Sequence, residues 1–176
     1  VRLIRVRMGF TRKRSGKKYS TPSHEDCVRF ANQYSAAMAY GLVVCVDESG
    51  FEQRPRPVYG FSPKGSRVTQ RPPSCRDHNR YNLIMGIGSD GSKNGLVVNS
   101  NVDAHVFETV ITSFPYPAGT TIVLDNASIH KTRQVLHAAE RKGYKLLFLP
   151  PCSPDFNAIE LIFGYMKNRF YRWRYE

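Results

Sequence analysis

The strongest constraint on the fold is an apolar run of residues that ends abruptly in a carboxylate. Residues 120–124 read Thr-Thr-Ile-Val-Leu and are followed at once by Asp125, and residues 41–46 likewise lead into Asp47. Such runs are too short for helices and are typical of strands buried on both faces of a parallel sheet. Because parallel sheets bind ligands beyond the carboxyl ends of their strands, we expect both aspartates at one functional edge.

The rest of the pattern predicts three further strands, over residues 81–87, 96–98 and 146–149, with a hairpin turn over 88–92. The resulting order, β-β-β-α-β-α-β-α, begins as an antiparallel meander and ends in parallel crossovers. It predicts an α/β fold with a mixed five-stranded sheet flanked by helices.

The helices are expected from capping residues and apolar stripes. Helices are predicted after Asn101, over 132–142 and from residue 159 onward. An earlier helix should begin after Ser23. Its expected apolar stripe consists of Val28, Ala31, Tyr34 and Met38.

The charge of the chain indicates a polyanionic partner. The net charge is +12, and residues 1–20 hold eight Lys or Arg and no acid. Nucleic acid is favoured over a membrane, with a solvated basic tether as the alternative for residues 11–18. The candidate DNA contacts are Arg2, Arg5, Arg12, Lys13, Arg14, Lys17, Lys18, Lys64 and Lys167.

Several other classes of protein are disfavoured. The four cysteines form no CxxC pair, and the chain has no secretory signal and no apolar run long enough to span a bilayer. We expect a reducing compartment, the cytoplasm or nucleoid of a bacterium or the nucleus of a eukaryote. The chain starts at Val1 without a Met, which indicates a start inside a longer polypeptide.

A third acid completes a candidate metal site. Glu160 opens the last helix, with thirty-four residues between it and Asp125. Phosphodiester cleavage can use two Mg²⁺ ions, which take carboxylate oxygens as ligands. In this interpretation Asp47 is the shared ligand, Asp125 holds one ion, and Glu160 holds the other and orients the attacking water.

Each acid also has a simpler interpretation. Asp47 or Asp125 can begin a turn after its strand, and Glu160 stands three residues after Asn157, the spacing of a capping box. Asp155 is an alternative to Glu160.

Two neighbouring side chains are weaker candidates. Glu48 should point to the opposite face of the sheet from Asp47. For His130 a packed or hydrogen-bonded histidine is favoured over a phosphate contact.

Three segments together resemble a known family. Residues 46–51 (VDESGF), 124–131 (LDNASIHK) and 149–160 (LPPCSPDFNAIE) resemble the catalytic core of mariner-superfamily DDE transposases, including their bacterial insertion-sequence relatives. The resemblance covers about residues 40–170. It implies a ribonuclease H-like fold, a DDE triad at Asp47, Asp125 and Glu160, and Mg²⁺ or Mn²⁺. It also implies cleavage of double-stranded DNA at transposon ends and attack of the freed 3′-hydroxyl on target DNA.

The resemblance divides the chain and leaves alternatives open. Residues 1–20 look like the tail of a helix-turn-helix DNA-binding region with a basic linker, and residues 21–176 like the catalytic domain, which is expected to work as a homodimer. The chain departs from the family at Ala158, usually Pro, and at Phe163, commonly Trp. A metal-dependent nuclease without strand transfer and a catalytically silent DNA-binding remnant are the alternatives.

Overall fold

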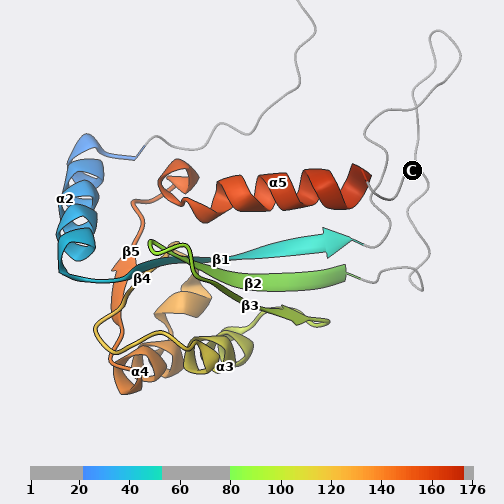
Figure 1. Ribbon diagram of the computed structural model, residues 1–176. Coiled ribbons are helices and arrows are strands. Elements are labelled where there is room, and N and C mark those ends of the chain that lie inside the picture. The colour runs from blue at the N-terminus through green and yellow to red at the C-terminus, as the bar shows by residue number, and fades with distance from the viewer. Residues whose placement is uncertain (1–21, 53–79, 173–176) are drawn as a thin grey trace, which may run out of the picture.

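A mixed sheet of five strands forms the centre of the computed structural model, which describes residues 22–52 and 80–172 (Figure 1). Across the sheet the strands follow the order β3-β2-β1-β4-β5. Strand β2 pairs in antiparallel orientation with both β1 and β3, whereas β4 and β5 extend the sheet from β1 in parallel orientation. The mixed sheet expected from the sequence is therefore confirmed. The strands are β1 (Val43–Glu52), β2 (Arg80–Gly88), β3 (Lys93–Val98), β4 (Thr121–Leu124) and β5 (Lys145–Phe148).

Helices cover both faces of this sheet (Figure 1). Helices α2 and α5 lie on one face, and α3 and α4 pack on the other. Within the described ranges, no helix has both the length and the apolar character needed to cross a bilayer. The helices are α2 (His24–Tyr40), α3 (Ala104–Ser113), α4 (Arg133–Arg141) and α5 (Ile159–Arg172), with short 3₁₀ helices η1 (Ser128–Lys131) and η2 (Pro154–Phe156).

The alternation of side chains along β1 decides which face each residue serves. Val44 and Val46 pack into the core under α3 and α4, whereas Val43 and Cys45 pack under α2 and α5. The same alternation directs Asp47 toward the α5 face and Glu48 toward the α3 face.

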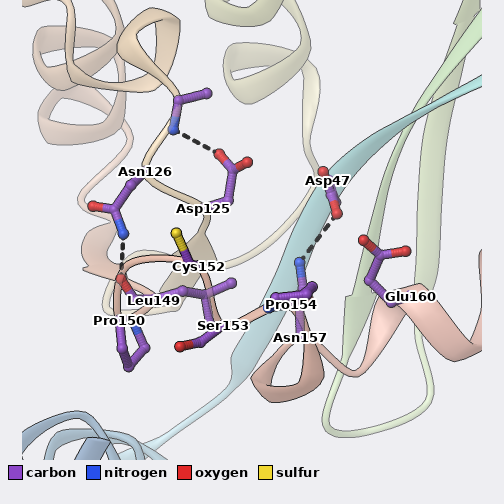
Figure 2. Close-up of a pocket in the computed structure, with 11 residues that line it drawn as sticks. Asp47, Asp125, Asn126, Leu149, Pro150, Cys152, Ser153, Pro154, Asn157 and Glu160 are labelled. Atoms are coloured by element: carbon purple, nitrogen blue, oxygen red, sulfur yellow. Dashed lines mark hydrogen bonds between the residues drawn. The ribbon is translucent and has the colours of Figure 1, made fainter. Parts of the chain in front are cut away.

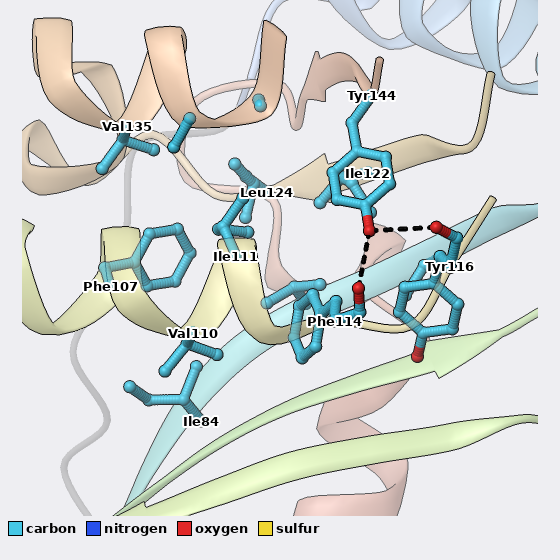
Figure 3. Packing of buried hydrophobic residues seen from close by; sticks show 14 residues of the cluster. Ile84, Phe107, Val110, Ile111, Phe114, Tyr116, Ile122, Leu124, Val135 and Tyr144 are labelled. Carbon is cyan, nitrogen blue, oxygen red and sulfur yellow. Dashed lines mark hydrogen bonds between the residues drawn. The ribbon is translucent and has the colours of Figure 1, made fainter. Parts of the chain in front are cut away.

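A hydrophobic core fills the space between the sheet and helices α3 and α4 (Figure 3). Phe107, Val110 and Ile111 of α3 are fully buried in it. The hydroxyl of Tyr144 lies 2.9 Å from the carbonyl oxygen of Phe114 and 3.2 Å from that of Tyr116, so its polar atom is satisfied. Full burial of each large apolar side chain stabilises the fold by about 1.5–3 kcal/mol, so this core holds α3 and α4 tightly against the sheet.

The prediction that β1 ends at Asp47 is wrong, because the strand continues to Glu52 in antiparallel pairing with β2. Its parallel pairing with β4, however, stops at the pair Cys45 and Val123. Asp47 therefore lies just beyond the point where β1 and β4 separate, and Asp125 follows the last residue of β4.

Two details of the helices also differ from the predictions. Asp103 rather than Asn101 caps α3, since its side chain accepts the backbone N–H of Val106 at 2.9 Å. On α2 the predicted stripe is wrong except for Tyr34.

The packed face of α2 is formed by Phe30, Tyr34 and Ala37. Val28 and Met38 are exposed, because the larger Phe30 takes the position against the sheet.

Candidate functional site

The three acids expected from the sequence line one pocket of about 210 Å³ (Figure 2). Asp47 comes from β1, Asp125 from the residue after β4, and Glu160 from the first turn of α5. The loop between β5 and α5 closes the remaining side. The other lining residues are Asn126, Ala127, Leu149, Pro150, Cys152, Ser153, Pro154 and Asn157.

Asn126 holds the end of β4 against the end of β5. Its side-chain amide donates a short hydrogen bond to the carbonyl oxygen of Leu149. Its oxygen accepts from the Lys131 ammonium at 2.7 Å. These contacts fix the backbone next to Asp125. Asn126 was not among the predicted site residues, although a polar amide directly after a strand-ending acid is a usable signal.

Asp47 is held in surroundings that disfavour its charge. Burial raises the pKa of Asp47 to about 7, and the nearby carboxylates of Glu48, Glu160 and Asp125 push it in the same direction. One oxygen, Oδ1, accepts the backbone N–H of Glu48 at 2.7 Å, which partly opposes this shift. A cation bound in the pocket would stabilise the ionised form.

The capping-box interpretation of Glu160 is wrong. The Asn157 side chain donates to Asp47 Oδ2 at 3.3 Å, as Figure 2 shows, and its backbone N–H donates to Pro154 O at 2.8 Å. Glu160 therefore does not close its own helix, and its carboxylate faces the pocket beside Asp47 (Figure 2). Asp155, the alternative acid, is exposed on η2 and does not line the pocket.

Asn157 itself was missed as a site residue. It is only 2% exposed, and its Oδ1 atom is buried with no hydrogen-bond partner among the described residues. A buried carbonyl oxygen without a donor costs about 1–3 kcal/mol, so this atom marks a place for a bound donor such as water. The asparagine lies 110 residues from Asp47 in the chain, and no local pattern reveals the contact.

His130 lies beneath the pocket and contacts two acids. It is fully buried, with Nε2 2.8 Å from Glu48 Oε1 and Nδ1 2.8 Å from Asp125 Oδ1. The second contact has ion-pair distance without the alignment of a hydrogen bond. Burial alone lowers the pKa of His130, but the two acids outweigh it and raise the pKa to about 9. The packed, hydrogen-bonded histidine favoured by the sequence is confirmed.

The contact with His130 in turn lowers the pKa of Asp125. Asp125 is therefore ionised at neutral pH, whereas the pKa of Asp47 lies close to neutral pH. The two aspartates of one pocket thus have opposite electrostatic surroundings. Glu48 lies on the far face from Asp47, as the strand alternation predicts.

The predicted DNA contacts fall almost entirely outside the described residues. The residues outside the described ranges are Arg2, Arg5, Arg12, Lys13, Arg14, Lys17, Lys18 and Lys64. Lys167 is described, and its ammonium lies 5.9 Å from the ring centroid of Phe51, away from the pocket lining. Its contact with DNA stays a prediction.

The pocket suits a divalent cation in the type of its oxygen atoms. Carboxylate and amide oxygens are preferred ligands of Mg²⁺ and Mn²⁺, and both the raised pKa of Asp47 and the unpartnered Asn157 Oδ1 would be relieved by a hydrated cation. Across residues 22–52 and 80–172, no three His, Cys, Asp or Glu side chains are close enough to enclose an ion as they stand. Enclosing one requires side-chain rotation, for which the exposed Glu160 has room.

Comparisons with known proteins agree with this architecture. A Mos1 transposase in a paired-end complex with the left transposon end superposes with a TM-score of 0.61 at 16% identity, over 94% of this chain and 55% of that chain. The catalytic domain of Mos1 mariner transposase gives 0.53 at 14% identity, over 88% and 75%. A chain of the simian T-cell lymphotropic virus intasome gives 0.54 at 14%, over 74% and 40%. No curated protein gives a significant match.

At these identities the structural matches establish the fold, and the predicted ribonuclease H-like fold is confirmed. This chain spans about half the length of the Mos1 chain in the paired-end complex, 55% of it. The family model of the DDE superfamily endonucleases matches residues 42–175, which is most of the 176-residue chain. The chain therefore belongs to the DDE superfamily endonuclease family.

Proposed function

We propose that this chain is the catalytic domain of a DNA transposase that cleaves DNA at transposon ends and joins the freed ends to target DNA. The observation that carries the proposal is the pocket itself. Asp47, Asp125 and Glu160 are far apart in the sequence but line one cavity within a DDE superfamily endonuclease fold. Bringing these carboxylates together costs free energy, and a bound cation would offset that cost, so the arrangement favours metal-dependent chemistry.

Mg²⁺ or Mn²⁺ is the proposed cofactor, with two ions held by Asp47, Asp125 and Glu160. Structures of the Mos1 catalytic domain with Mg and with Mn support the choice of metal. When bound, such ions activate the attacking oxygen and stabilise the leaving oxygen of a phosphodiester. The residues of the chain supply the orientation, because Asn157 holds Asp47 Oδ2 and the start of α5 directs Glu160 into the cavity.

The proposed partners are double-stranded DNA, as transposon ends and as target, and a second copy of the chain. Mos1 has been solved in a paired-end complex with a transposon end and in a strand transfer complex, which supports DNA as the partner. The net charge of +12 favours the same polyanion. The expected location remains the cytoplasm or nucleoid of a bacterium or the nucleus of a eukaryote, where DNA is accessible.

The test is DNA cleavage by pocket variants. In Mn²⁺ with plasmid DNA, Asp47→Asn, Asp125→Asn and Glu160→Gln should each lower nicking by about 100-fold or more, while DNA binding persists. Asp155→Asn is the matched control, because this acid is exposed outside the pocket, and it should cut like the native chain. A pocket variant that retains native cleavage contradicts the assignment.

A second measurement separates transposition from simple hydrolysis. With pre-cleaved DNA ends, a transposase joins them to target DNA, whereas a nuclease of the same family yields no joined product. A catalytically silent remnant would bind DNA in a salt-sensitive manner without nicking it.

A further inference from the structure

A buried ion-pair network lies directly under the proposed metal ligands. His130 is fully buried, and its ring stacks on Phe107 with a centroid distance of 4.2 Å. On one side it meets Glu48, and on the other it meets Asp125, each at 2.8 Å. Burying a charged imidazole costs several kcal/mol unless it is paired, so the two acids stabilise the charged form of the buried ring.

Glu48 and Phe107 together leave His130 little freedom of movement. Glu48 lies on the face of β1 opposite to Asp47, so the strand alternation that directs Asp47 into the pocket also directs Glu48 beneath it. The side chain of Glu48 is 19% exposed, and its Oε1 lies 2.8 Å from the Nε2 atom of His130. Glu48 and Phe107 consequently hold the ring from two directions.

The His130 ring restricts the orientation of the Asp125 carboxylate. Its side chain is 48% exposed, which by itself would allow rotation. One oxygen, Oδ1, meets His130 at 2.8 Å and accepts the backbone N–H of Ala127 at 2.9 Å. Among the described residues Oδ2 accepts no hydrogen bond, so this oxygen is left for a ligand.

We propose that His130, held in place by Glu48, is a positioning residue that fixes Oδ1 of Asp125 and thereby presents Oδ2 to the divalent cation. The inference rests on the proposed function, since it concerns the same pocket. It differs from a purely structural role, in which His130 would fill the core without influencing the affinity for metal. Residues that orient a metal ligand from behind affect metal affinity or activity by about 10–100-fold.

Two substitutions at position 130 separate these roles. His130→Asn keeps an amide group at about the position of Nδ1, near Asp125, but its side chain is too short to contact Glu48. His130→Gln keeps an amide nitrogen at the reach of Nε2, near Glu48, but removes the group beside Asp125. Binding of Mn²⁺ alone, measured by electron paramagnetic resonance on the full chain, is the readout. His130→Gln should weaken Mn²⁺ binding by about 10–100-fold, whereas His130→Asn should keep most of the native affinity.

The native chain and Asp125→Asn provide the reference. If the native chain binds Mn²⁺ and Asp125→Asn weakens binding, the proposed metal site holds, and unchanged binding in His130→Gln then overturns the inference alone. Equal losses in His130→Gln and His130→Asn overturn it as well. If the native chain binds no Mn²⁺, the proposed function fails and the inference fails with it.

A second pair of variants covers loss of folding at position 130. Glu48→Gln keeps an oxygen that accepts from His130, whereas Glu48→Leu keeps a similar volume without an acceptor. Circular dichroism first establishes that each variant is folded. Glu48→Leu should weaken Mn²⁺ binding by about 10-fold or more relative to Glu48→Gln. Equal Mn²⁺ affinities of these two variants overturn the inference.

Discussion

At the scale of single residues, Asp47 shows how the pocket trades folding stability for chemistry. Its pKa of about 7 reflects burial first and then the neighbouring carboxylates. An unfolded chain holds this carboxyl at a pKa near 4, so between about pH 4 and pH 7 the folded state carries a proton that the unfolded state has lost. The contribution of Asp47 to stability is therefore complete below pH 4 and lost as the pH rises through 7.

The variant Asp47→Asn should remove this pH dependence. Without divalent metal, its free energy of unfolding should exceed that of the native chain by about 1–3 kcal/mol at pH 8, and the difference should shrink toward pH 4. Urea unfolding at pH 5, 6 and 8 in the presence of a chelator measures it. A native chain whose stability does not fall relative to Asp47→Asn over this range would contradict the assigned pKa shift.

Asn157 permits a second residue-scale prediction. Asn157→Ala removes the donor to Asp47 Oδ2 from a buried position, but it also removes the unpartnered Oδ1, so the loss of stability should stay below about 1.5 kcal/mol. Cleavage in Mn²⁺ should also fall by about 10–100-fold, because Asp47 loses an orienting contact. The control is Asn168→Ala, which truncates an exposed asparagine of α5 and should leave both properties unchanged. Native cleavage by Asn157→Ala would show that the contact does not orient Asp47.

At the scale of elements, the position of α5 decides whether Glu160 reaches the pocket. The helix is held on the sheet by Ile159 and Phe163, which are 0% and 2% exposed and pack with Phe30 of α2. Phe163 replaces the tryptophan common in the resembling family, and it serves as a packing residue. Ala158, which replaces a proline, has a backbone N–H that bonds to the Cys45 thiol, a contact that proline would lack.

Phe163→Ala should loosen α5 and with it the placement of Glu160. We expect a loss of about 3–5 kcal/mol in unfolding free energy, because a fully buried aromatic side chain leaves a cavity. Leu161→Ala is the control on the same helix, since this leucine is 80% exposed, and it should change stability by less than about 0.5 kcal/mol. Thermal or urea unfolding of both variants provides the measurement. Similar losses for the two would contradict the packing of α5.

The elements also show what the sequence could predict. The buried strands and the opposite directions of Asp47 and Glu48 follow from apolar runs and a two-residue period, which are local properties. The extension of β1 to Glu52 was not predicted, because beyond Asp47 it pairs with β2 through a mixed segment that contains Ser49 and Gly50 instead of an apolar run.

The side chains that orient the acids depend on contacts between distant parts of the chain. His130 meets Glu48 across 82 positions, and Asn157 meets Asp47 across 110. The spacing of Asn157 and Glu160 suggested a helix cap, but the tertiary hydrogen bond to Asp47 takes the asparagine side chain instead. Local patterns therefore predicted the acids of the pocket and not the side chains that orient them.

At the scale of the whole molecule, the net charge of +12 should dominate the interaction with DNA. Contacts between lysine or arginine and phosphate release counterions, so affinity falls steeply with salt and carries little sequence information. From the resemblance alone, base recognition is predicted to lie in a helix-turn-helix region of which residues 1–10 would be the tail. We therefore expect this chain to bind different duplexes with similar affinity.

This expectation is tested by fluorescence anisotropy with a transposon-end duplex and an unrelated duplex of equal length. If the chain neutralises six to ten phosphates, its affinity should fall by about 10³–10⁵-fold between 50 and 200 mM salt for both duplexes. Asp125→Asn should bind at least as tightly as the native chain, since it removes a negative charge from the pocket that faces the phosphates. A strong preference for the end duplex, or an affinity insensitive to salt, would show that base contacts within residues 1–176 dominate binding.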